Sequence, residues 1–317
     1  MAEVERGPKS KKYRKKKRWP SSWPGRVVLS ILAAALILAG FRLPQFVAVL
    51  QVRQLDGQLG WGVGSSLPRI YQVFFWVFGT ADSISLHGAR VTNGDSWVFG
   101  PLHDCRYVSL METRLTGGLA ALNGEHALHH LFLNDNKEIT DADLHALHFS
   151  NFPHLAALAL TLSPKVTGTG FAGPKDCPSL KFLSVGTCGS FSNDGLAAIC
   201  RFTNLQALIL SGTSITDSGL RCLMRLKDLR LIELDDTRIT EGGLRTLSHI
   251  ASLRDIAIEN DNISVRSLRC LRKLPRLKYL RLAGDGIRKR DAEAVLGRHV
   301  RVDLQQPSGG ELLILGE

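Results

Sequence analysis

Histidines form the first group of side chains whose type and spacing suit chemistry. Six of them fall within residues 126–154, and His145 and His148 are one helical turn apart, a spacing compatible with metal binding. Neither a cysteine nor a carboxylate accompanies that pair at a matched spacing. The sequence also lacks G-x-S-x-G, phosphate-loop and H-E-x-x-H motifs. We therefore predict no metal, no cofactor and no catalytic residue, and expect a protein that is not an enzyme.

Acidic residues form the second group, on two neighbouring predicted strands. Alternate side chains of a strand share one face, so these carboxylates are expected to lie together on an exposed sheet. The adjacent pair Asp235-Asp236 has no acid/base partner in a predicted pocket, which argues against glycosidase-type chemistry. We predict a ligand-binding patch, with an ordinary solvated surface as the alternative; its residues are Glu233, Asp235, Asp255, Glu259, Tyr279 and Arg281. The N-terminal half of the same face is expected to be small and neutral.

A repeated unit of about 24 residues must position these side chains. Residues 205–223 (LQALILSGTSITDSGLRCL) return 24 positions later with the same apolar spacing, a short strand followed by a helix-like pattern. The second leucine of each L-x-L strand recurs along the chain at Leu86, Leu110, Leu133, Leu160, Val185, Leu210, Leu234, Ile258, Leu282 and Leu304. This periodicity predicts an α/β leucine-rich-repeat solenoid of about nine repeats, a right-handed horseshoe with a parallel inner sheet and convex helices.

Two recurring polar positions accompany the leucines. A Ser or Thr stands before each predicted helix, where its hydroxyl is expected to act as the N-cap; these residues are Thr92, Thr116, Thr140, Thr167, Ser192, Thr216, Thr240 and Ser264. Three residues after each strand, polar side chains such as Asn136 and Thr213 are expected to hydrogen-bond the backbone of a neighbouring turn. Between residues 161 and 180, Pro and Gly predict an irregular loop instead of a full helix.

The unit L-x-x-L-x-L-x-x-T-x-I-T-D-x-G-L-x-x-L resembles that of membrane-anchored leucine-rich-repeat proteins known mainly from planctomycete-type bacteria. The similarity covers roughly residues 20–304 and includes a basic N-terminus, one apolar span and an aromatic segment ahead of the repeats. It implies a horseshoe that projects from a membrane, and it supplies neither catalytic residues nor a ligand.

The N-terminus carries the charge and a candidate anchor. Residues 1–26 hold ten Lys/Arg against two Glu, so most of the net charge of +11 belongs to this tail and no nucleic-acid partner is expected. The apolar run after it is long enough for a bilayer span. We predict a disordered cytoplasmic tail (1–24), a transmembrane anchor (25–42) that contacts the lipid bilayer, a juxtamembrane N-terminal cap (43–80), repeats (81–304) and a flexible C-terminal tail (305–317). A signal peptide cleaved near Ile37-Leu38-Ala39 is the alternative.

The six cysteines are scattered, with no close C-x-x-C pair. Cys222 and Cys270 occupy the same helical position two repeats apart, which places them about 10 Å from each other, too far for a disulfide. We interpret all six as mostly buried thiols, which leaves the redox compartment open.

These features predict a single-pass membrane protein with a cytoplasmic N-terminus and periplasmic or extracellular repeats. Its expected function is recognition of a protein or other macromolecule by the concave face. The alternatives are an envelope or cell-surface scaffold, and a soluble intracellular adaptor with a basic targeting tail.

Overall fold

The computed structural model describes residues 58–61, 81–86, 105–113, 117–173, 177–259, 263–283, 287–297 and 299–304. The predicted tails (1–24 and 305–317), the predicted anchor (25–42) and all of the predicted cap except residues 58–61 lie outside these ranges. Within them, no helix has the length and apolar character that crossing a bilayer requires.

The strands form a single sheet of eleven strands in sequence order. The first two pair antiparallel, and every later neighbour is parallel. The strands are β1 (Gln58–Trp61), β2 (Ala81–Ser85), β3 (Tyr107–Ser109), β4 (His130–Phe132), β5 (Ala157–Ala159), β6 (Phe182–Ser184), β7 (Ala207–Ile209), β8 (Leu231–Glu233), β9 (Asp255–Glu259), β10 (Tyr279–Ala283) and β11 (Arg301–Leu304). The ten parallel strands confirm the predicted repeat solenoid, and β1 falls within the segment predicted as its cap.

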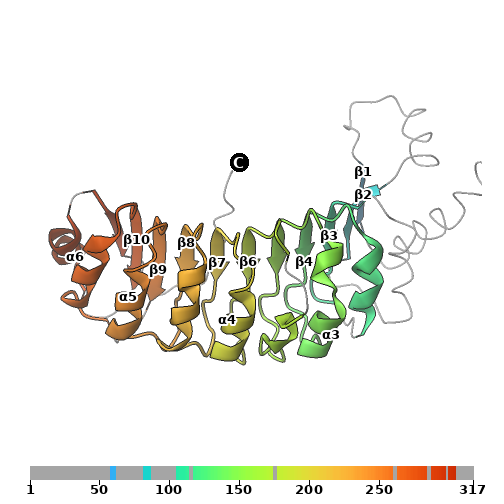
Figure 1. Ribbon diagram of the computed structural model, residues 1–317, viewed down its shortest axis with the longest axis horizontal. Helices are drawn as coiled ribbons and strands as arrows, with labels where there is room; N and C mark the ends of the chain where they lie inside the picture. Colours follow the sequence, from blue (N-terminus) through green and yellow to red (C-terminus); the bar gives the residue numbers. More distant parts are fainter. Residues whose placement is uncertain are drawn as a thin grey trace, which may run out of the picture. The chain divides into compact units, whose positions relative to one another are not determined.

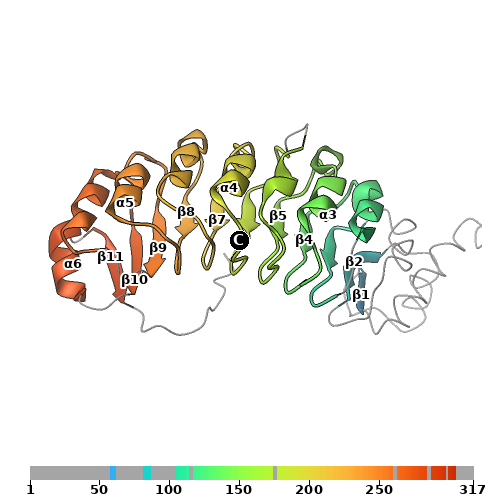
Figure 2. The same cartoon turned by 90° about the horizontal axis from the view of Figure 1, so that it is seen from below.

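Short helices cover one side of the sheet, and among the described residues none covers the other side (Figures 1 and 2). The row of helices follows the outer side of the array's arc, and the strands line its inner side. The helices are η2 (Gly118–Gly124), α3 (Asp141–Ala146), η3 (Phe149–Asn151), η4 (Thr169–Phe171), α4 (Asn193–Ile199), η5 (Gly219–Arg225), α5 (Glu241–Leu247), η6 (Ser267–Lys273) and α6 (Lys289–Leu296). The three-residue η4 confirms the predicted irregular segment.

The core lies between the sheet and the helices and consists of stacked leucines. Leu210 and Leu234 from the strand side and Leu220 and Leu244 from the helix side are 0% exposed. Each repeat buries its apolar face only against its neighbours, which is the energetic basis of a solenoid.

Polar ladders satisfy the backbone at the turns that follow the strands, as predicted. Asn136 donates to the carbonyl oxygens of Leu110 (2.6 Å) and Leu133 (2.9 Å). Thr213 donates to Leu210 O at 2.6 Å. These carbonyls are buried, so leaving them without a donor costs free energy.

Each repeat also caps the helix of the next repeat. Asp141 accepts hydrogen bonds from Thr167 N (3.0 Å), Thr167 Oγ1 (2.6 Å), Gly168 N (2.9 Å) and Gly170 N (2.9 Å). Burial alone favours the protonated carboxyl, but these four donors outweigh it and hold the pKa of Asp141 below its usual value. The three-residue helix η4 leaves its first N–H groups without an internal acceptor, so this external cap supplies what the helix lacks.

The same link recurs farther along the array. Asn193 accepts from Thr216 N (3.1 Å) and Asp217 from Thr240 N (2.8 Å). The glycine of the T-D-x-G motif permits this close approach, because a methyl group on Gly219 would collide with the side-chain amide of Asn193. Asp143 reaches in the opposite direction and accepts from Gly117 N.

The predicted N-caps are partly confirmed. Thr140 forms a capping box with Asp143, and Thr240 accepts from Gly242 N at 3.2 Å. Ser192 accepts from Gly195 N at 3.5 Å. Before η6, Ser264 Oγ accepts from Ser267 N at 3.3 Å as predicted, although the residue at the N-cap position is Arg266. Before η5 the prediction is wrong, because this 3-10 helix begins later and its N-cap residue is Ser218.

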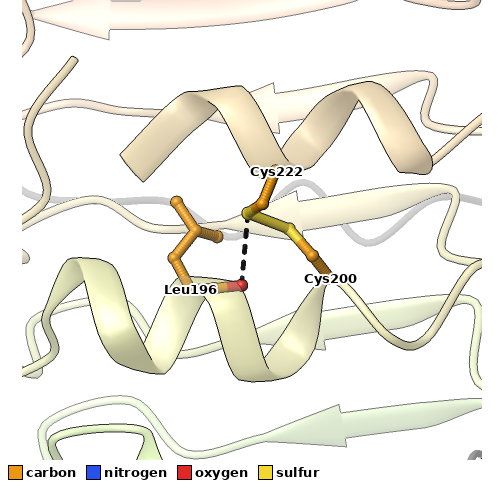
Figure 3. Close-up of a disulfide and its surroundings, with 3 residues drawn as sticks. All are labelled: Leu196, Cys200 and Cys222. Atoms are coloured by element: carbon orange, nitrogen blue, oxygen red, sulfur yellow. Dashed lines mark hydrogen bonds between the residues drawn. A yellow bond between two sulfur atoms is a disulfide. The ribbon is translucent and has the colours of Figure 1, made fainter. Parts of the chain in front are cut away.

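The interpretation of all six cysteines as thiols is wrong, because Cys200 and Cys222 form a disulfide (Figure 3). Their Cα atoms are 5.9 Å apart, and Cys222 Sγ lies 3.4 Å from Leu196 O. Comparing equivalent positions of the repeat missed this pair, since the end of α4 packs against the middle of η5. Burial raises the pKa of the Cys188 thiol to about 11 and raises that of Cys177 as well, which makes both unreactive.

Candidate functional site

One transverse row of residues on the open face of the sheet organises the predicted site. Glu233 on β8 pairs with Ala257 on β9, and Ala257 pairs with Arg281 on β10. The alternation of each strand directs all three side chains to the concave side. Ala257 is 6% exposed and adds only a methyl group to this row.

Arg281 crosses β9 over Ala257 and reaches the carboxylates of the β8 repeat. Its Nη2 lies 2.5 Å from Asp235 Oδ2 and 3.5 Å from Glu233 Oε2. The exposed fractions of the three side chains are 13% for Arg281, 11% for Asp235 and 22% for Glu233. A guanidinium held this close to two carboxylates and shielded from water forms a strong, charge-assisted contact.

The carboxylates outnumber this cation. Asp236 and Glu259 border the same area, where Asp236 N donates to Glu259 O at 3.1 Å. We call Glu233, Asp235, Asp236 and Glu259, together with Arg281, the acidic cluster. Four carboxylates against one guanidinium leave a formal charge of −3. Within the described part of the chain, Asp235 Oδ1 and Arg281 Nε are buried without a hydrogen-bond partner. The polar atoms of the cluster are therefore not all satisfied.

Burial and mutual repulsion shift the protonation of the cluster. Burial raises the pKa of Glu233 despite the attraction of Arg281. Burial, followed by repulsion from Asp235, raises the pKa of Glu259. Burial disfavours the charged form of Arg281, but Asp235 and Glu233 outweigh it and raise the pKa of the guanidinium. A second cation at this place would lower the pKa values of Glu233 and Glu259.

The structure divides the six predicted residues into two groups. Glu233, Asp235, Glu259 and Arg281 lie together. Asp255 and Tyr279 pair with each other at the start of their strands, where burial raises the pKa of Asp255 and Arg254 and Lys278 oppose that shift. The hydroxyl of Tyr279 donates to Asp303 Oδ2 at 3.0 Å, and Asp303 on β11 pairs with Arg281 on β10.

An aromatic group lies at the other end of the concave face, so the expectation that the side chains of this half are small is wrong there. Tyr107 on β3 is 39% exposed, and its ring centroid lies 5.3 Å from that of Phe132 on β4. The ring of His130 lies 6.2 Å from Tyr107 and 6.4 Å from Phe132. Burial, followed by the nearby His129, lowers the pKa of His130 and favours its neutral form.

Sequence reasoning placed Phe132 on the concave face but missed Tyr107 and His130, because it considered only two side chains per strand. Tyr107 and His130 occupy a third position, one pleat earlier, which the same period-2 alternation also places on the concave face. A count of three alternating positions would have identified them. We call Tyr107, His130 and Phe132 the aromatic group.

A surface pocket of about 550 Å³ lies apart from both groups. It is lined by Glu112, Thr113, Asp135, Lys137 and Glu138, at the turns that follow β3 and β4. Lys137 and Glu138 are exposed, and Glu138 forms an ion pair with Lys165 at 2.5 Å. Among the described residues, no cluster of His, Cys, Asp and Glu has the arrangement of a metal site.

The fold defines a leucine-rich-repeat solenoid with an open concave face. No family model matches the sequence, and no curated protein matches it. Among solved structures, the chain is similar to the functional domain of InlJ from Listeria monocytogenes, which is described as including a cysteine ladder. The identity is 13% and the TM-score 0.40, and the match covers 58% of this chain and 37% of that chain. This chain therefore matches little more than a third of the InlJ chain's length.

Proposed function

We propose that this protein is a non-enzymatic recognition protein, anchored in a membrane by residues 25–42, whose concave face binds a protein partner outside the cytoplasm. The observation that carries the proposal is the acidic cluster, in which Arg281 neutralises only part of the negative charge. A lysine or arginine of a partner would complete it. Open concave faces are the usual binding surfaces of solenoids.

The size of the area favours a macromolecular partner over a small molecule. The acidic cluster centres on β8–β10, and the aromatic group lies on β3 and β4 of the same sheet. Five strand spacings separate β4 from β9, which corresponds to about 25 Å. A partner that contacts both areas gains aromatic contacts at one end and charge complementarity at the other, a combination typical of protein interfaces.

Two features support a location outside the cytoplasm. The basic tail and apolar run at the N-terminus have the charge asymmetry of a membrane anchor with its N-terminus inside, and the chain resembles membrane-anchored planctomycete-type proteins. The Cys200–Cys222 disulfide is of a kind that persists in oxidising compartments. Protease treatment of intact cells tests this location: digestion of the repeats is expected, and protection of the repeats would instead favour the intracellular adaptor.

Charge reversal tests the binding face. Glu259→Lys adds a cation to the acidic cluster, and Asp194→Lys makes the same change at an exposed position of α4 on the helix side. Cross-linking on intact cells followed by quantitative mass spectrometry compares both variants with the wild type. We expect Glu259→Lys to lose a cross-linked partner that Asp194→Lys retains. Identical profiles for the two variants would exclude recognition at this cluster and favour the scaffold alternative.

A further inference from the structure

Two rows of basic side chains, five of them Arg or Lys and one a histidine, run along the helix side of three consecutive repeats. Arg221, Arg245 and Arg269 occupy one helical position, each 24 residues after the last. A second row at the next turn of each helix is formed by Arg225, His249 and Lys273. All six side chains are exposed. We call the two sets the convex cation rows.

The helices that carry these rows are neighbours in space. η5, α5 and η6 pack side by side along the outer side of the array (Figures 1 and 2). Neighbouring packed helices have axes about 8–10 Å apart, so the row of Arg221, Arg245 and Arg269 presents a positive charge at roughly this interval along the solenoid. The rows lie on the opposite side of the sheet from the acidic cluster.

Within the described part of the chain, no row residue forms an ion pair. The ion pairs there involve Lys165, Arg281, Arg288, Lys289 and Arg290, and none of the six row residues. Glu241 is the acidic residue of these three helices, and its carboxylate accepts a hydrogen bond from Ser264 Oγ at 2.8 Å. Stacked like charges destabilise the array, so the rows do not serve folding.

We propose that the convex cation rows bind an acidic polysaccharide strand, independently of the concave face. The guanidinium fork matches a carboxylate or sulfate oxygen pair, and arginine provides four of the five permanent charges in the rows. A linear polymer with anionic groups at intervals can lie across η5, α5 and η6 and meet one cation from each. Basic patches of this kind are typical of polyanion-binding surfaces.

The chemistry of the same helices argues against two other polyanions. The fully described segments η5, α5 and η6 contain no aromatic residue on which nucleic-acid bases could stack. Their leucines Leu220, Leu244 and Leu268 face the core, and Met224 is the exposed large apolar side chain on them. The helices therefore lack the apolar face that membrane-surface helices insert between lipids.

Binding of the full chain to polygalacturonate tests the proposal, with neutral dextran as the control polymer. The row variant is Arg221→Gln/Arg245→Gln/Arg269→Gln. The control variant, Arg106→Gln/Lys181→Gln/Lys278→Gln, removes the same charge at exposed positions just before β3, β6 and β10. We expect the row variant to weaken binding about tenfold or more at low salt and to reduce the salt-dependence slope by about two to three. The control variant should stay close to wild type.

The basic tail requires its own control, since it carries ten cations within residues 1–26. All measurements are repeated with these cations replaced by Gln, and the effect of the row variant should be the same in both backgrounds. Equal weakening by the row and control variants would overturn the proposal, since it would indicate non-specific charge. Tighter, row-dependent binding to phosphatidylglycerol vesicles or to single-stranded DNA would overturn the polysaccharide assignment.

Discussion

Arg281→Met is expected to destabilise the protein strongly at neutral pH and weakly in mild acid. The substitution keeps the aliphatic stem that crosses Ala257 and removes the guanidinium that contacts Asp235 and Glu233. The two carboxylates then remain largely shielded from water, with exposed fractions of 11% and 22%, and without their counter-charge. They would repel each other in addition.

The structure sets the magnitude of this effect. Removing one partner of a buried ion pair costs about 3–5 kcal/mol, and the residual exposure of Glu233 reduces this through solvent screening. We therefore expect a loss of about 3 kcal/mol in the free energy of unfolding at pH 7. The pKa of Glu233 is already raised in the wild type, and loss of Arg281 raises it further. Protonation of Glu233 at lower pH removes one of the two uncompensated negative charges, so the loss should fall to about 1–2 kcal/mol in mild acid.

Urea unfolding at pH 7 and pH 5 measures both numbers. The double variant Asp235→Asn/Arg281→Met completes a thermodynamic cycle and should be more stable at pH 7 than Arg281→Met alone, since it removes the stranded charge. A loss below about 1 kcal/mol at pH 7, or one that does not change between the two pH values, would refute the reasoning, because an uncompensated buried carboxylate must produce both effects.

Three further predictions concern the array. Cys222→Ala should lower the free energy of unfolding by about 3 kcal/mol in oxidising buffer and by much less with reductant present, because the disulfide closes a loop of 22 residues. Alkylation of the unfolded, unreduced wild type should label four cysteines. Asp141→Ala should lower the free energy of unfolding by about 2–4 kcal/mol in urea unfolding at pH 7. Because the pKa of Asp141 is lowered in the folded state, its contribution is present above the unfolded pKa and is lost as the pH falls below about 4. Leu162→Gly should stabilise the protein by up to about 1 kcal/mol in thermal melting, because Leu162 has φ +58° and Gly212 occupies the equivalent turn position. Gly212→Ala, at φ +68°, should destabilise the protein in the same assay.

The contacts that recur in every repeat could be predicted from the sequence, because equivalent positions of the 24-residue unit have equivalent surroundings. Leu210 and Leu234 are buried for the same reason, and finding one locates the others. The turn ladders of Asn136 and Thr213 follow equally, since every turn has a carbonyl that needs a donor. Deviations from the period were missed, as with the later start of η5 and with the disulfide between two non-equivalent positions, Cys200 and Cys222.

The acidic cluster could be predicted only as a set of neighbouring carboxylates. Strand alternation placed Glu233 and Asp235 on the concave face, and the sequence located Arg281 two repeats later. The alternation of side chains along a strand predicts the face on which a side chain lies, but not which neighbouring strand it contacts. The contact between Arg281 and Asp235 depends on the small size of Ala257 and on the long side chain of Arg281, which are properties of packing and not of period.

Most of the side chains that cap a helix of a neighbouring repeat reach toward the C-terminal neighbour. Asp141, Asn193 and Asp217 each satisfy the helix that follows them in the chain, whereas Asp143 reaches back. If one repeat opens, the repeat on its C-terminal side loses the acceptor for its first turn, while the repeat on its N-terminal side retains its own. Local unfolding of one turn is therefore expected to destabilise the repeats on its C-terminal side more than those on its N-terminal side. The acidic cluster lies on the C-terminal side. In a nearest-neighbour description, the coupling between repeats is asymmetric, and substitutions far from the cluster on its N-terminal side can alter its rigidity.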